Sequence, residues 1–142
     1  VDFPRGLLQA DTYDFSFSGL KTAATNYVHT IKQRGDDLPV AHIAASLQAA
    51  IVEVLVSKTV AAARAYNVQT ILLSGGVAAN EALRRELTHA ASSLGVKVYY
   101  PSKVLCTDNA AMIACAGHYR YLRGERSPWN LNATPQLRLG DL

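Results

Sequence analysis

The residues best suited to do chemistry form one short segment, residues 74–80, which reads Ser-Gly-Gly-Val-Ala-Ala-Asn. An apolar run at 70–73 leads into it, and a helix-like segment at 81–94 follows. Glycines let backbone N–H groups approach an anion closely, and the helix N-terminus adds partial positive charge. The pattern therefore predicts either a phosphate-binding turn at Gly75 and Gly76 or a plain strand-to-helix turn. It is not a dinucleotide fingerprint or a P-loop, because the third glycine and the Gly-Lys-Ser/Thr are missing.

Asn80 stands at the start of the predicted helix. Its side chain could cap the helix or turn its amide toward a ligand.

A second candidate segment is Cys-Thr-Asp-Asn-Ala-Ala at residues 106–111, which opens another predicted helix. Ligands of open α/β sheets bind outside the carboxyl ends of the strands, so Asn80 and Asp108 are expected to face one crevice. Asp108 could hold a metal ion through a carboxylate oxygen. The simpler alternative is that Thr107 or Asp108 is the N-cap of the helix.

The remaining polar clusters are less specific. Ser-Gly-Leu-Lys-Thr at 18–22 is not a phosphate loop, because its Gly and Lys are not adjacent. No pair of histidines has the i, i+4 spacing of a helical metal site. Several arginines lie near predicted helix ends, where they form solvated faces or contact a nucleic-acid backbone: Arg84, Arg85, Arg120, Arg123 and Arg126.

Strands and helices must position these residues. Tyr13, Phe15 and Phe17 alternate with polar residues, which predicts a half-buried strand over 11–18. The other predicted elements are helices at 20–34, 38–67, 81–94 and 108–122, strands at 69–73 and 96–100, and an irregular tail at 127–142. Alternating strands and helices indicate an α/β fold with parallel strands. Three strands are few for such a sheet, so we expect part of a larger domain.

Composition sets broad limits. The chain has 142 residues, 49% of them hydrophobic and 18% charged, with a net charge of +3 and two cysteines. These values are typical of a single globular domain with reduced thiols, and the mild positive charge permits an anionic partner. No signal peptide or unbroken apolar run of membrane-spanning length is predicted.

Three motifs in order carry a family resemblance: residues 14–22 (Asp-Phe-Ser-Phe-Ser-Gly-Leu-Lys-Thr), 74–84 and 106–114. Together they resemble the C-terminal half of the TsaD/Kae1/Gcp family, formerly called O-sialoglycoprotein endopeptidases. The resemblance implies a two-lobe fold of the actin/Hsp70/sugar-kinase (ASKHA, ribonuclease-H-like) type around a nucleotide cleft. It also implies transfer of a threonylcarbamoyl group from threonylcarbamoyl-AMP to N6 of adenosine 37 in tRNAs that read ANN codons.

By the same resemblance, Gly75, Gly76 and Asn80 would contact the nucleotide or acyl-adenylate, and Asp108 would ligate a divalent metal, iron or zinc. The implied partners are tRNA and TsaB-like and TsaE-like proteins in the cytoplasm, without a membrane. No residue of the segment is identified as a general base, so the catalytic residues are not assigned.

The sequence departs from the family pattern in one large respect. The family's His-x-x-x-His metal ligands and its first Ser-Gly-Gly-His phosphate segment have no match among these residues. We therefore expect a C-terminal lobe that is inactive by itself and binds metal weakly or not at all, since a cleft needs both walls. The alternatives are a nucleotide-binding ATPase or sugar-kinase-like lobe and a non-catalytic dimerisation module built on helix 38–67.

Overall fold

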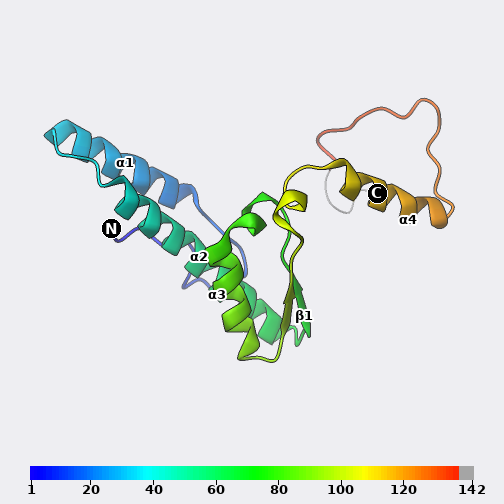
Figure 1. Ribbon diagram of the computed structural model, residues 1–142, viewed down its shortest axis with the longest axis horizontal. Helices are drawn as coiled ribbons and strands as arrows, with labels where there is room; N and C mark the ends of the chain where they lie inside the picture. Colours follow the sequence, from blue (N-terminus) through cyan, green and yellow to red (C-terminus); the bar gives the residue numbers. More distant parts are fainter. Residues whose placement is uncertain (138–142) are drawn as a thin grey trace. The chain divides into compact units, whose positions relative to one another are not determined.

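The computed structural model describes residues 1–137 and divides the chain into two compact units, residues 1–107 and residues from 108 onward. The first unit contains helices α1 (Ser18–Arg34), α2 (Val40–Ala65) and α3 (Glu81–Ser92), strands β1 (Thr70–Leu72) and β2 (Lys97–Tyr99), and two 3-10 turns, η1 (Gly76–Ala79) and η2 (Lys103–Leu105) (Figure 1). The second unit contains α4 (Ala110–Leu122).

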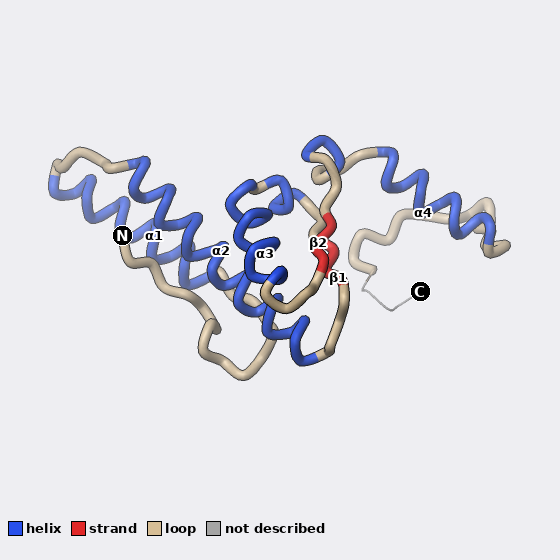
Figure 2. The backbone as a smooth tube through the Cα atoms, turned by 60° about the horizontal axis from the view of Figure 1, so that its bottom comes forward, coloured by secondary structure: helices blue, strands red, loops and turns tan. Residues whose placement is uncertain are grey.

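Helices α1 and α2 form a hairpin and lie side by side in both views of the backbone (Figures 1 and 2). Gly35 ends α1 with a left-handed φ of 73° and donates its N–H to the last carbonyls of the helix, as the sequence predicts. The core of the hairpin is apolar: Phe3, Leu20, Ile43 and Ala50 are buried. The Phe3 ring also meets Tyr27 edge-on, with 5.9 Å between ring centroids. The N-terminal segment is thereby packed against both helices.

Strands β1 and β2 pair in parallel, with Ile71 opposite Val98. Each strand has a half-buried central residue between two exposed ones, as a sheet covered on one face requires. Helix α3 connects the two strands and packs on both β2 and α2. The predicted parallel α/β arrangement is therefore confirmed for this unit, with a sheet of two strands in the described chain.

The prediction of a strand over residues 11–18 is wrong, since this segment is irregular up to the start of α1. Alternating side chains do not make a strand unless a neighbouring strand offers ladder hydrogen bonds. Here the backbone bonds elsewhere: the carbonyls of Ala10 and Thr12 accept from the Lys58 ammonium group on α2. Phe15 and Phe17 still share a side, with stacked rings 6.4 Å apart.

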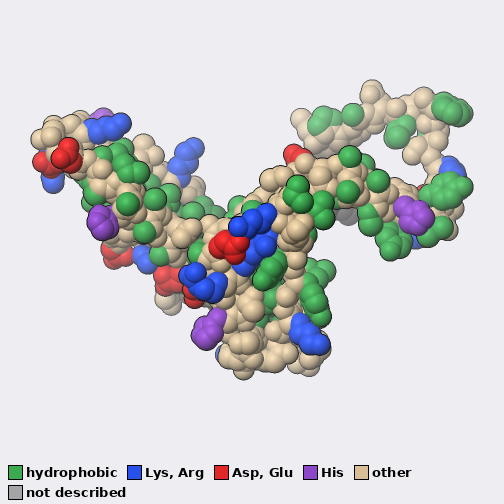
Figure 3. Space-filling model, viewed as in Figure 1, with side chains coloured by type: hydrophobic (Ala, Val, Ile, Leu, Met, Phe, Trp, Pro, Cys, Tyr) green, Lys and Arg blue, Asp and Glu red, His purple; other side chains and the backbone are tan. Residues whose placement is uncertain are grey.

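Helix α4 begins two residues later than predicted. Asn109, not Thr107 or Asp108, is its N-cap, and its side-chain oxygen accepts from the Met112 N–H at 3.0 Å. None of the α4 residues is buried within the described chain, and hydrophobic side chains cover much of the helix surface (Figure 3). The irregular tail is confirmed as far as residue 137, and residues 138–142 lie outside the described part.

Among the described helices, α2 alone is long and apolar enough to cross a membrane, with a mean hydropathy of 1.7. A core helix of a water-soluble protein has the same length and composition, so this is weak evidence for a span. In the first unit, α2 packs against α1 and α3.

Candidate functional site

The glycine loop, residues 74–79, follows β1 directly. Gly75 turns the chain with φ 87° and ψ 172°, a conformation that strongly favours glycine. The Ala78 N–H then donates to the Gly75 carbonyl at 2.9 Å and closes the turn of η1. Gly75 and Gly76 are exposed, and a Cβ atom added at either would meet nothing within 4 Å. The backbone of the loop is therefore open to a ligand.

Asn80 joins the glycine loop to α3. Its Oδ1 accepts from the Leu83 N–H at 3.0 Å, so the predicted helix cap is confirmed. Its Nδ2 donates to Oε1 of Gln48 on α2, also at 3.0 Å. Both ends of the amide are thus held by the protein, and the side chain is oriented before any ligand arrives. Sequence reasoning did not find Gln48, because 32 residues separate it from Asn80.

Arg84 is the clearest residue that sequence reasoning misplaced. The sequence groups it with exposed arginines near helix ends, but Arg84 is only 8% exposed. Its guanidinium donates to the Ala78 carbonyl of the glycine loop and, at 2.9 Å, to the Pro101 carbonyl beyond β2. The neighbouring Arg85 is exposed and pairs with Glu86, as a surface arginine would.

Asp108 is the first residue of the second unit and is exposed. Asn80 belongs to the first unit and Asp108 to the second, so the crevice that they are expected to share stays a prediction. Within residues 1–137, no group of three or more His, Cys, Asp or Glu side chains comes together in a way that could hold a metal ion.

An exposed ion pair ties the start of α3 to η2. The Lys103 ammonium lies 2.5 Å from Oε1 of Glu81, the first residue of α3. The hydrogen bond from Lys103, followed by its charge, lowers the pKa of the Glu81 carboxyl below its usual value.

We expect Lys103→Ala to raise the pKa of Glu81 toward the ordinary value of 4.5, because the two largest causes of the lowering disappear and only the smaller effect of the Arg84 charge stays. A carboxyl with a depressed pKa in the folded state stabilises the fold above its unfolded pKa, and this contribution is lost as pH falls through the folded pKa. NMR titration of the Glu81 carboxyl carbon measures the shift, with Lys97→Ala as the control. An unchanged titration in Lys103→Ala would contradict the assigned cause.

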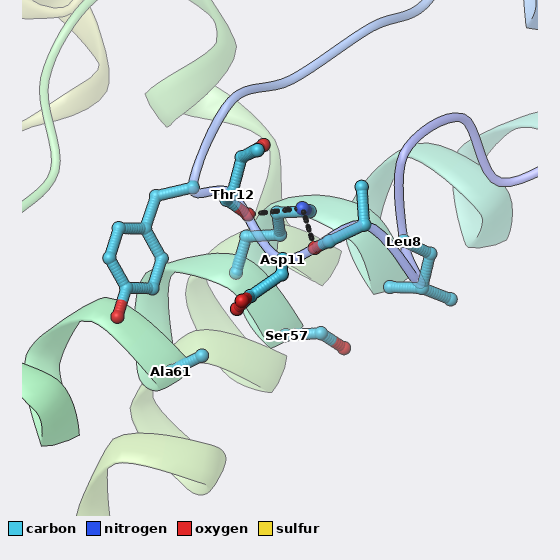
Figure 4. Close-up of a pocket in the computed structure, with 8 residues that line it drawn as sticks. Leu8, Asp11, Thr12, Ser57 and Ala61 are labelled. Carbon is cyan, nitrogen blue, oxygen red and sulfur yellow. Dashed lines mark hydrogen bonds between the residues drawn. The ribbon is translucent and has the colours of Figure 1, made fainter.

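A cavity of about 360 Å³ lies between α2 and the segment before α1 (Figure 4). Lys58 on α2 lines it and is only 4% exposed. Its ammonium group donates to the carbonyls of Ala10 and Thr12, so it fixes the chain that leads toward the motif at 14–22. Sequence reasoning missed Lys58, although its position four residues after Val54 and three before Ala61 puts it on the apolar face of the helix.

Lys58→Met is expected to destabilise the chain by about 1–3 kcal/mol, because two partly buried carbonyls would lose their donor. Urea unfolding followed by circular dichroism measures the change. The matched control is Lys21→Met, an exposed lysine on α1, for which we expect a change within about 0.5 kcal/mol. Equal effects of the two substitutions would show that the Lys58 contacts contribute nothing.

Comparison with known proteins gives consistent matches. The family model for tRNA N6-adenosine threonylcarbamoyltransferase, TsaD, matches residues 1–115. A curated relative of that name from Moorella thermoacetica is 53% identical over 139 residues, which cover 98% of this chain and 41% of the relative. One from Desulfitobacterium hafniense is 50% identical over 138 residues, covering 97% of this chain and 40% of the relative.

A third relative of the same name, from Geobacillus thermodenitrificans, is 52% identical over 140 residues, or 98% of this chain and 41% of the relative. The chain thus spans about two-fifths of the length of the curated relatives it matches. The resemblance carried by the three sequence motifs is confirmed, and the chain belongs to the TsaD family of tRNA N6-adenosine threonylcarbamoyltransferases.

Proposed function

We propose that this chain is the C-terminal part of an enzyme that transfers threonylcarbamoyl from threonylcarbamoyl-AMP to N6 of a tRNA adenosine, and that its glycine loop binds the phosphate of the donor. The observation that carries the proposal is the exposed backbone of Gly75 and Gly76, which open the 3-10 turn that leads into a capped helix in a TsaD-family chain. Backbone N–H groups at a helix N-terminus are a common phosphate-binding arrangement.

In the proposed reaction, the N6 amine attacks the carbonyl carbon of the threonylcarbamoyl group. A C–N bond forms, the C–O bond to the phosphate breaks, and AMP leaves with the bonding electrons while the amine loses a proton. Negative charge grows on the phosphate as AMP leaves. Amide donors of Gly75 and Gly76 would stabilise that charge without reorganising, because η1 and the Asn80 cap already fix the loop.

A metal centre does not fit the described residues of this chain by themselves. Asp108 would supply one carboxylate, whereas protein-bound zinc uses three or four protein ligands. We propose that Asp108 is one ligand of an iron or zinc ion whose other ligands lie outside this chain, and the steps above do not depend on it. The two-lobe ASKHA fold, the TsaB-like and TsaE-like partners and the cytoplasmic location belong to the same proposal.

A chimera tests the function directly. In it, residues 1–142 replace the matching part of the Moorella thermoacetica relative. Supplied with threonylcarbamoyl-AMP and an ANN-decoding tRNA, the chimera is expected to form threonylcarbamoyl-adenosine, detected by mass spectrometry of the digested tRNA. The 142-residue chain alone is expected to form none. A folded chimera without activity, beside an active relative, would reject the proposed function.

A further inference from the structure

The Arg84 side chain contacts two separate stretches of the first unit. Its Nε donates to the Ala78 carbonyl in η1, and its Nη2 donates to the Pro101 carbonyl at 2.9 Å and to the Cys106 sulfur at 3.2 Å. The guanidinium carbon also lies 4.4 Å from the centre of the Tyr100 ring. One side chain on α3 therefore holds both the glycine loop and the segment that follows β2.

A buried cation is costly unless its donors are satisfied. The described ion pairs include no carboxylate on Arg84, and its contacts are two backbone carbonyls, a sulfur and a ring face. A guanidinium presents its donors in a rigid planar fork, so it fixes the direction of each acceptor as well as its distance. A lysine has one charged nitrogen and could not occupy all of these positions together.

The two stretches that Arg84 holds lie next to the candidate site residues. Ala78 lies within η1, whose first residue is Gly76, so its carbonyl direction is coupled to the orientation of the loop amides. Cys106 is 4% exposed and ends the segment that leads, two residues later in the chain, to Asp108. Fixing Pro101 and Cys106 therefore also fixes the last residues of the first unit, which directly precede Asp108 in the chain.

We propose that Arg84 is a positioning residue that couples the glycine loop at 74–79 to the segment 101–106, so that the loop amides keep the orientation a phosphate needs. The coupling of the two segments stands on the contacts alone. Its importance for a phosphate ligand rests on the proposed function.

The coupling is tested on the 142-residue chain with Arg84→Gln, Arg84→Lys and the exposed neighbour Arg85→Gln as the matched control. In a Cys115→Ser background, Cys106 is the one thiol of the sequence. Labelling by a disulfide reagent is expected to be at least tenfold faster in Arg84→Gln than in Arg85→Gln. Amide hydrogen exchange at Ala78 and Asn80 should accelerate in the same variant by a comparable factor.

Arg84→Lys separates positioning from simple burial of charge. We expect it to regain most of the melting temperature that Arg84→Gln loses. Either the faster amide exchange at Ala78 and Asn80 or the faster labelling of Cys106 should persist. Tyr100→Leu supplies a variant that should fold in any case, because that ring is 43% exposed. This variant removes the ring contact to Arg84 in the segment after β2. We expect it to accelerate amide exchange at Ala78 in the glycine loop.

Three results would overturn the coupling: Cys106 labelling that accelerates while exchange at Ala78 and Asn80 is unchanged, full restoration of both segments by Arg84→Lys, or a Tyr100→Leu variant with wild-type exchange in the loop. The ligand consequence is measured separately, as AMP affinity in the chimera, where Arg84→Lys is expected to weaken binding about tenfold. A parent chimera that binds no AMP would count against the proposed function and leave the exchange and labelling results to decide the coupling.

Discussion

Gly76→Ala is expected to lower the affinity of the chimera for AMP by about ten- to a hundred-fold and to leave its melting temperature unchanged. A Cβ atom at Gly76 meets no atom within 4 Å, and its φ lies outside the left-handed region, so alanine fits the folded chain. The new methyl group would stand where a phosphate must approach the backbone. Loss of one hydrogen bond to a charged group costs about 1.5–3 kcal/mol, which matches that range of affinity.

Gly75→Ala is the matched variant, because its site is equally open but its backbone is not equally tolerant. With φ at 87°, an alanine there strains the chain by about 1–3 kcal/mol. We therefore expect Gly75→Ala to lower both the melting temperature and the AMP affinity, whereas Gly76→Ala lowers the affinity alone. Calorimetric titration and thermal unfolding of the two chimeras distinguish the cases.

The glycine pair can also contradict the proposal. If Gly76→Ala binds AMP as well as the parent chimera while Gly75→Ala is merely less stable, the loop is a strand-to-helix turn without a ligand. That outcome would favour the simpler of the two sequence interpretations of residues 74–80.

Local signals in the sequence predicted most of the helices. Gly35 in the left-handed conformation ends α1, and Asn80 caps α3, as expected from their residue types alone. Such signals act over three or four residues, so they can be recognised without knowing what packs nearby. The order of the elements also predicted the parallel pairing of β1 and β2, because a helix between two short strands leaves few other arrangements.

The wrong predictions concern segments and side chains whose structure depends on contacts with residues far away in the sequence. Residues 11–18 have the alternation of a strand, but the carbonyls of Thr12 in this segment and of Ala10 just before it accept from Lys58, 46 and 48 residues away. Arg84 looks like a surface arginine, but its acceptors include Pro101 and Cys106, 17 and 22 residues away. A single sequence without known contacts does not indicate these partners, which became visible only in the structure.

The local structure around the candidate site was predicted correctly. The sequence placed Gly75, Gly76 and Asn80 in one turn between a strand and a helix, and the structure has that turn. Their role toward a nucleotide, and the proximity of Asp108, remain predictions. The reason is physical: Asp108 opens a second unit, and its position depends on contacts other than those within the first.

Asn80→Asp is expected to weaken AMP binding by the chimera about ten- to a hundred-fold with little loss of stability. Aspartate caps a helix as well as asparagine, so the bond to the Leu83 N–H survives, and a negative charge is favourable at a helix N-terminus. The donor to Gln48 is lost, but that bond is exposed. A carboxylate about 4 Å from a phosphate opposes it by about 1–4 kcal/mol near a protein surface.

Asn80→Ala provides the contrast, because it removes the cap without adding charge. We expect it to cost about 1 kcal/mol in unfolding free energy, measured in urea. The two variants should therefore rank in opposite order, with Asn80→Asp the more stable and Asn80→Ala the better binder of AMP. Raising the salt concentration should narrow the gap in affinity, since screening weakens the repulsion. Equal AMP affinity of Asn80→Asp and the parent chimera would place the phosphate away from this end of α3, whatever the enzyme's activity.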